Sequence, residues 1–256
     1  MRVLLTNDDG ITSPGLAALA RAVCRVAETY VVAPEHERSA ASHAITLHKP
    51  LRATRASIRD VDVTAWATNG TPADCVVLAV LDLMGTPPDI VVSGINVGAN
   101  LGMDLIYSGT VSGAVEAALF GIPSVAISVG AFREIHWEPA AAFAATLVGE
   151  LSRRGLPRDT FLNVNVPNLP ADELRGVEIT RQGTRRYVSR LEKRSDPRGR
   201  DYYWLTGSAA DEGSAEGTDV RAVAEGRISV TPLRLDMTHD ELDAVVRSWN
   251  LTVPTT

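Results

Sequence analysis

Short apolar runs alternate with one-sided helical patterns along the first two thirds of the chain. The apolar runs predict strands at 3–6, 29–33, 61–65, 90–93, 124–128 and 161–166. Between most of them, apolar residues spaced three and four apart predict helices at 14–26, 73–83, 111–120 and 139–153. This alternation favours an α/β fold with a mostly parallel sheet flanked by helices.

Beyond Pro167 the pattern changes. The stretch up to Gly217 mixes charged, aromatic and turn residues, which favours β-hairpins that project from the body over further βαβ units. A strand at 228–233 and a helix at 239–249 follow. We therefore expect one domain over 1–256. It combines a Rossmann-like core at 1–167 with a hairpin arm, late strand and terminal helix at 168–256 that pack on a second subunit.

Composition narrows the class of protein. The chain is 45% hydrophobic and 22% charged, as is typical of a globular protein, and no uncharged apolar run reaches the roughly 18 residues of a membrane span. The N-terminus reaches Asp8 too soon for the apolar core of a signal peptide, so we expect a soluble, cytoplasmic protein with no membrane partner. Cys24 and Cys75 lack metal-site spacing and are expected to be small core residues.

Although the net charge is −6, the segment 181–201 is basic, since it contains eight arginine or lysine residues and three acidic ones. Such a mixed run is typical of a solvated arm or a subunit contact. Because the total charge is acidic and no aromatic ladder accompanies the arginines, we do not expect nucleic acid as the main partner.

The candidate chemistry begins where the first predicted strand ends, at Asp8 and Asp9, which Gly10 follows. Ligands bind at the carboxyl ends of strands in an open α/β sheet, and two adjacent ionised carboxylates repel each other unless a cation neutralises them. A turn or a helix cap accounts for one aspartate but not for both. The pair therefore favours a metal or phosphate site.

Two further loops follow strands of the same predicted sheet. The first holds Ser39, Ser42 and His43, and the second holds Asn96 among several glycines. Oxygen ligands from these loops and from the aspartate pair would suit a hard cation, Mg²⁺ or Mn²⁺. The proposed set is Asp8, Asp9, Ser39 and Asn96.

The second loop ends at Ser108, Gly109 and Thr110, where an alanine-rich helix begins. Free amides and the positive end of the helix dipole favour a phosphate there, although capping by Ser108 or Thr110 explains the same residues. A metal site beside a phosphate seat indicates phosphoryl transfer, most simply to water.

Several long motifs occur in one order along the chain. They are VLLTNDDG, APEHERSAASHAITL, NGTPADCV, SGINVGANLGMDLIYSGTVSGAVEAALFGIPSVAIS and GTDVRAVAEGRISVTPL. Together they closely resemble the SurE family of survival-protein nucleotidases, over nearly the whole chain. The resemblance implies a metal-dependent phosphomonoesterase that acts on nucleoside 5′- and often 3′-monophosphates, with short polyphosphate in some members. It also implies homodimers or homotetramers that exchange C-terminal elements.

The resemblance carries roles over residue by residue. The family's metal ligands fall on Asp8, Asp9, Ser39 and Asn96, which would hold one divalent ion per subunit. The phosphate-side loop maps onto Ser108, Gly109 and Thr110, with Asn96 also on the substrate side. Two departures bear on substrate preference: Ala40 stands where the family more often has glycine, and Ser112-Gly113 replaces a pair that is more often alanine or glycine.

The expected mechanism is in-line attack by a water that the cation activates and that Asp8 or Asp9 orients or deprotonates. A covalent aspartyl-phosphate on Asp8 is the alternative. His43 is a candidate acid for the leaving alkoxide, although a lone loop histidine is more often only a polar loop residue. Candidates for the rim of the site are Asn69, Gly70, Thr71 and Asp74, of which Thr71 serves equally well as a helix cap.

Two other classes of function also fit an acidic pair after the first strand. A signalling receiver domain binds Mg²⁺ there beside an aspartate that becomes phosphorylated, but this chain is too long and lacks the lysine on a later strand end. A nucleotide-binding module would bind its ligand without releasing a product. Steady phosphate release distinguishes a phosphatase from both.

Overall fold

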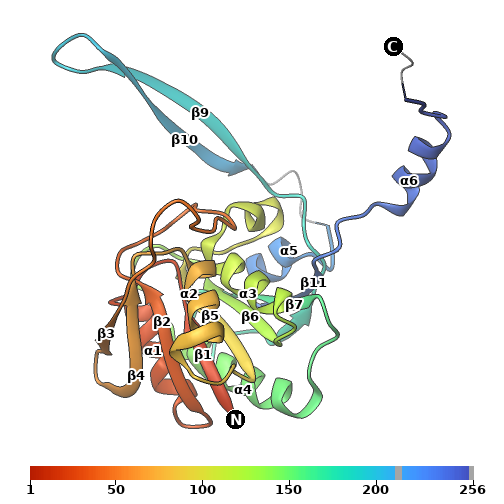
Figure 1. Ribbon diagram of the computed structural model, residues 1–256. Helices are drawn as coiled ribbons and strands as arrows, with labels where there is room; N and C mark the ends of the chain where they lie inside the picture. The colour runs from red at the N-terminus through yellow and green to blue at the C-terminus, as the bar shows by residue number, and fades with distance from the viewer. Residues whose placement is uncertain (211–214, 254–256) are drawn as a thin grey trace.

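The alternating pattern folds into a nine-stranded mixed sheet between two layers of helices (Figure 1). The computed structural model describes residues 1–210 and 215–253. The elements of the core are β1 (Arg2–Thr6), α1 (Pro14–Val23), β2 (Glu28–Pro34), β3 (Ala53–Ile58), β4 (Val61–Thr68), α2 (Pro72–Leu78), the π-helical turn η1 (Ala79–Leu83), β5 (Ile90–Val97), the 3₁₀ helix η2 (Gly102–Tyr107), α3 (Gly109–Leu119), β6 (Ser124–Val129), α4 (Trp137–Arg154) and β7 (Thr160–Val166). The C-terminal part adds β8 (Val177–Ile179), β9 (Arg186–Ser195), β10 (Asp201–Ala210), α5 (Asp219–Ala224), β11 (Ile228–Arg234) and α6 (Asp240–Arg247).

The order of strands in the sheet is β3-β4-β2-β1-β5-β6-β7-β11-β8. All neighbouring strands are parallel except β3 against β4 and β11 against β7. From β1 the chain moves outward through β2 to β4, then returns to place β5 on the other side of β1. Strands β1 and β5 therefore flank the point at which strand order reverses, where open α/β sheets bind their ligands. The mostly parallel α/β architecture confirms the fold class that the sequence predicts.

Both faces of the sheet are covered, which explains why the central strands are apolar throughout. In β1, Val3 and Leu5 pack with Leu16 of α1 on one face, whereas Leu4 packs with Val76 of α2 on the other. Helix α4 lies on the α1 side, and α3 lies on the α2 side. Burying each such leucine stabilises the fold by about 1.5–3 kcal/mol.

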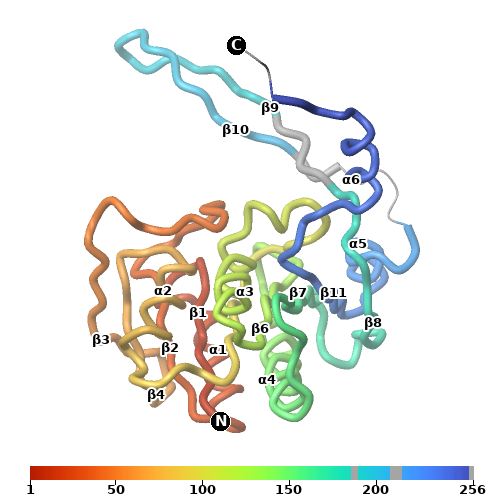
Figure 2. Tube along the Cα trace, turned by 45° about the vertical axis from the view of Figure 1, so that its right-hand side comes forward, coloured from red at the N-terminus to blue at the C-terminus, as the bar shows by residue number. Residues whose placement is uncertain are grey.

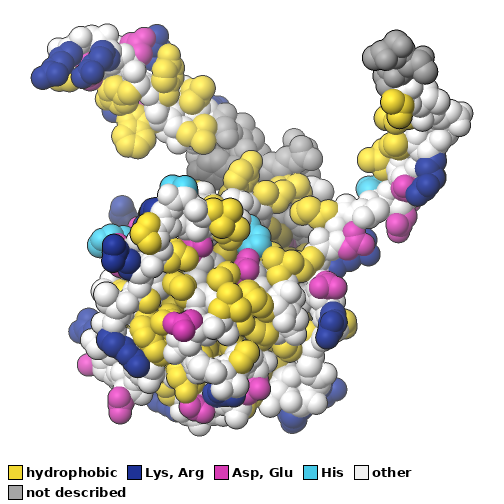
Figure 3. All heavy atoms as spheres, viewed as in Figure 1, with side chains coloured by type: hydrophobic (Ala, Val, Ile, Leu, Met, Phe, Trp, Pro, Cys, Tyr) yellow, Lys and Arg dark blue, Asp and Glu magenta, His cyan; other side chains and the backbone are white. Residues whose placement is uncertain are grey.

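The hairpin β9–β10 and helix α6 leave the body at the end opposite the N-terminus (Figures 1 and 2). Both carry exposed apolar side chains, which Figure 3 shows gathered along these two extensions. On the hairpin these are Leu191, Tyr203, Trp204 and Leu205, and on α6 they include Leu242 and Val245. An isolated two-stranded hairpin is only marginally stable in water, so these side chains are suited to packing against another surface. The projecting hairpin predicted for the region beyond Pro167 is confirmed.

The base of the hairpin is tied to η2 by a buried carboxylate. Asp219, at the start of α5, accepts hydrogen bonds from the backbone N–H groups of Gly102 and Gly183, each at 2.8 Å. The backbone N–H of Met103 donates to the carbonyl of Arg185 at 2.9 Å. The segment that precedes the hairpin is therefore attached to the segment that leads into α3.

Several sequence expectations need correction. The edge strand β3 was not predicted, because its sequence, ATRASI, is half polar and lies largely exposed. Helix α1 ends at Val23 rather than at 26, and Cys24 caps it with an exposed side chain, so the expectation of a core residue there is wrong. Cys75 is buried, as expected. Among the residues described, no helix combines the length and hydropathy needed to cross a membrane.

Candidate active site

Asp8 brings the loops after β1 and β5 together. Its side chain is 4% exposed and accepts a hydrogen bond from the Thr110 hydroxyl in the first turn of α3. Gly109 packs directly against it, since a Cβ on Gly109 would lie 2.8 Å from the Cβ of Asp8. The Asp8 carbonyl also accepts from the backbone N–H of Arg38 at 2.7 Å, which attaches the loop after β2.

Asp9 lies beside the end of β5, where its Oδ2 accepts a hydrogen bond from the Val97 N–H at 3.3 Å. Burial, together with the neighbouring charge of Asp8, raises the pKa of Asp9 to about 7. Burial also raises the pKa of Asp8, against the lowering effect of the Thr110 hydrogen bond. Glu37 in the loop after β2 adds negative charge to both, and the sequence analysis did not single it out.

This pair of carboxylates fits a divalent cation. Within the described residues, neither aspartate has a lysine, arginine or histidine at ion-pair distance. Nor do those residues contain a cluster of three or more histidine, cysteine or acidic side chains, so neutral oxygens would complete the ligand set. Asn96, on β5, donates its amide N–H to the Gly98 carbonyl at 2.8 Å, so its Oδ1 is the side-chain atom that could bind a cation.

Helix α3 begins in contact with Asp8. Ser108 caps it, because its hydroxyl accepts from the Val111 N–H at 3.1 Å, so the capping interpretation holds for this residue. The Thr110 hydroxyl is engaged by Asp8. The positive end of the helix therefore lies against the carboxylate of Asp8, where negative charge is favourable.

The comparisons with known proteins agree on one family. The family model described as "Survival protein SurE" matches residues 3–189. The chain belongs to the SurE family. It is 50% identical to "5′-nucleotidase SurE" of Heliobacterium modesticaldum over 97% of this chain and 92% of the relative, and 52% identical to the protein of that name from Geotalea uraniireducens over 98% and 100%. The crystal structure of the SurE protein from Aquifex aeolicus superposes with a TM-score of 0.84, at 41% identity, over 98% of this chain and 100% of that one.

Ser39, carried over from the SurE resemblance as a metal ligand, lies in an exposed part of the loop after β2. Its hydroxyl donates to the carboxylate of Glu37 and makes no hydrogen bond to Asp8 or Asp9. Its role as a ligand stays a prediction. The next residue, Ala40, has a φ of +55°, a conformation that favours glycine. This conformation gives a physical reason for the glycine that the SurE resemblance leads us to expect at this position.

His43 is held by a partner that the sequence analysis missed. Its Nε2 lies 2.7 Å from Oε2 of Glu116 on α3, and the imidazole side chain is 34% exposed against 11% for the glutamate. The sequence did offer a signal for Glu116, because a charged residue on the buried side of an alanine-rich helix needs a polar partner. The loop also bonds at Ser42, whose N–H and hydroxyl donate to the carbonyls of Tyr107 and Ile106.

The four rim candidates brace the loop after β2. Thr71 caps α2 in a reciprocal capping box with Asp74, which bears out the capping interpretation. The Thr71 hydroxyl also donates to the Ala44 carbonyl at 2.7 Å, and Asp74 accepts from the N–H and hydroxyl of Thr46. The Asn69 side chain accepts from the Arg52 N–H at 2.9 Å, and Gly70 packs against Asp74.

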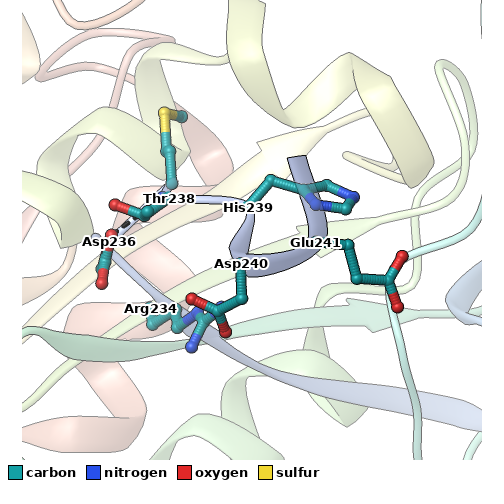
Figure 4. Close-up of a pocket in the computed structure, with 7 residues that line it drawn as sticks. Arg234, Asp236, Thr238, His239, Asp240 and Glu241 are labelled. Atoms are coloured by element: carbon teal, nitrogen blue, oxygen red, sulfur yellow. Dashed lines mark hydrogen bonds between the residues drawn. The ribbon is translucent and has the colours of Figure 1, made fainter. Parts of the chain in front are cut away.

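A hollow of about 390 Å³ lies apart from these residues, on the segment between β11 and α6 (Figure 4). Polar side chains such as Arg234, Asp236 and His239 line it, and the Thr238 N–H donates to Asp236. None of the site residues described above lines this hollow. It belongs to the C-terminal extension, and we assign it no part in the chemistry.

Proposed function

We propose that this chain is a metal-dependent 5′-nucleotidase, a phosphomonoesterase that hydrolyses nucleoside monophosphates to nucleoside and phosphate. The observation that carries the proposal is the pair Asp8 and Asp9 at the end of β1. Asp8 is buried against the start of α3, Asp9 is partly buried beside the end of β5, and neither has a counter-charge among the described residues. The 5′-nucleotidases of the SurE family at about half identity support the substrate class. Activity on 3′-monophosphates and short polyphosphate is included in the proposal.

The ligands proposed for one Mg²⁺ or Mn²⁺ per subunit are Asp8, Asp9, Ser39 and Asn96. Such an ion supplies positive charge to the phosphoryl group and activates the attacking water when it is bound. Asp9 orients that water, and Thr110 fixes the carboxylate of Asp8 through its hydroxyl. The Asp9 carboxylate needs no large rearrangement to do so, because Val97 already holds it.

The first turn of α3 binds and stabilises the phosphoryl group. Amides at Gly109 and Thr110, with the helix dipole, would face the phosphoryl oxygens as charge shifts during attack. Ser108 and Asn96 complete the substrate side. His43 protonates the ester oxygen of the leaving nucleoside, which avoids expulsion of a free alkoxide.

A receiver-like signalling domain is not favoured, because the family's named members are nucleotidases. For the assembly we propose a homodimer or homotetramer that exchanges its C-terminal elements, located in the cytoplasm. The exposed apolar side chains of the hairpin and of α6 support a second copy of this chain as the partner. Nucleic acid and membrane are not proposed as partners.

The test is a phosphate-release screen over 5′- and 3′-mononucleotides, sugar phosphates and polyphosphate. Each substrate is assayed with Mg²⁺, with Mn²⁺ and with a chelator. We expect multiple turnovers on nucleoside monophosphates that the chelator abolishes. A protein that becomes stably phosphorylated without turnover, or that binds nucleotide without releasing phosphate, would overturn the proposal.

A further inference from the structure

The pairing of His43 with Glu116 is a contact that the proposed mechanism does not explain. The imidazole lies in a loop, and the carboxylate lies on α3, in the same helix whose first turn holds Asp8. Glu116 follows Thr110 by six residues, so its backbone is about 9 Å further along the helix axis. Because helical side chains lean towards the N-terminus, the carboxylate reaches back towards the phosphate end.

The loop is fixed on both sides of the histidine. Before it, Ser42 donates to the carbonyls of Ile106 and Tyr107, immediately upstream of Ser108. After it, Thr71 donates to the Ala44 carbonyl, and Thr46 donates to Asp74. The imidazole is therefore presented from a braced segment beside the first turns of α3.

Glu116 has no competing cationic partner in the part of the chain that the structure describes. Its side chain is 11% exposed, and the ion pair to His43 is its recorded salt bridge. An ionised carboxylate only accepts hydrogen bonds, so Nε2 must be the donor in this contact. The other ring nitrogen, Nδ1, has no hydrogen bond within the described part of the chain.

We propose that Glu116 is a positioning residue that accepts the Nε2–H of His43 throughout the reaction and so presents Nδ1, protonated in the imidazolium, to the ester oxygen of the leaving nucleoside. This inference rests on the proposed nucleotidase function. In the step, water adds its oxygen to phosphorus, and the electron pair of the bond to the ester oxygen leaves with that oxygen. The acid is the imidazolium, which carries a proton on each ring nitrogen. The ester oxygen takes the Nδ1 proton, which leaves the neutral Nε2–H tautomer bonded to Glu116. The attacking water releases a proton to solvent, and Nδ1 takes one back from solvent before the next turnover.

The test compares two substrates that differ in their need for an acid. The leaving group of adenosine 5′-monophosphate is the adenosine 5′-oxygen, a poorly stabilised alkoxide. The leaving group of p-nitrophenyl phosphate is p-nitrophenolate, which is stable without a proton. In Glu116→Gln we expect kcat on the nucleotide to fall by about 10-fold to 100-fold, but by less than about threefold on the nitrophenyl ester. His43→Asn should show the same pattern, and the double variant should lose little more than His43→Asn alone.

The matched control is Glu150→Gln, which removes a glutamate from α4 that pairs with Arg153 and Arg154 on the surface. It should leave both substrates unchanged. Equal losses on both substrates in Glu116→Gln, no loss on either, or losses that multiply in the double variant would overturn the positioning role. If the unaltered protein with Mn²⁺ releases no phosphate from either substrate, the proposed function itself fails. Thermal melts of each variant identify any loss that comes from unfolding.

Discussion

Asp8 and Asp9 make the stability of the metal-free protein depend on pH at the scale of single residues. The pKa of Asp9 is raised from 3.8 to about 7, so the folded state binds more protons than the unfolded state between these values. The free energy of unfolding should therefore fall as pH rises from about 4 to about 7. Thermal melts in chelator over this range measure the effect. The loss should be smaller in Asp9→Asn and should disappear with Mn²⁺, whereas a Tm that rises with pH in both proteins would contradict it.

Replacing Asp9 should have opposite effects on stability and on turnover. Asp9→Asn removes a ligand charge and a buried repulsion together, so phosphate release should fall by at least about 100-fold while the fold is kept. Release assays with saturating Mn²⁺, run beside circular dichroism melts, check both parts. Undiminished turnover in this variant would remove Asp9 from the ligand set.

The backbone conformation of Ala40 should lower the stability of the folded protein. Its φ of +55° is a left-handed conformation that strains an alanine but not a glycine. Ala40→Gly should raise the free energy of unfolding by about 1 kcal/mol. Ala142→Gly, at an exposed position in α4, is the control and should lower it by about the same amount. Chemical denaturation of the two variants gives the comparison, and a loss in both would mean that the strain at Ala40 is absent.

At the scale of elements, the contact between α3 and the strand end requires a glycine. Gly109→Ala places a Cβ 2.8 Å from that of Asp8, and should destabilise the protein by about 1–3 kcal/mol and lower turnover by on the order of 100-fold. Gly149→Ala in α4 meets nothing within 4 Å and should stabilise by about 1 kcal/mol with unchanged turnover. Urea melts and release assays test both. Equal responses of the two variants would show that Gly109 is not in close contact.

The elements that the sequence predicts well are those with one dominant signal. The apolar run of β1 and the alanine-rich α3 are found close to their predicted bounds, and Asp8, the first of the adjacent aspartates, contacts the start of that helix. What the sequence does not reveal depends on distant contacts. Strand β3 is stabilised by pairing with β4 rather than by its own apolar pattern. Glu116 acquires its hydrogen-bond partner, His43, only when the loop after β2 folds against α3.

At the scale of the whole molecule, α6 extends from the body and exposes Leu242 and Val245, and Trp249 is exposed just beyond its end. A chain that ends after Leu235 should therefore form a smaller oligomer, because it lacks this apolar surface. Size-exclusion chromatography with light scattering gives the mass, and far-UV circular dichroism shows whether the core persists. An unchanged mass would assign assembly to the hairpin alone.

The attachment of the hairpin base to η2 has a consequence for the assembled protein. Asp219 holds Gly102 and Gly183 in one rigid unit, and η2 continues directly into Ser108. In the proposed oligomer, a neighbouring subunit that displaced the hairpin would therefore pull on the residues from which α3 starts. If phosphate binds at the start of α3 as proposed, subunit contacts and phosphate affinity would be coupled, and each would change the other by the same factor.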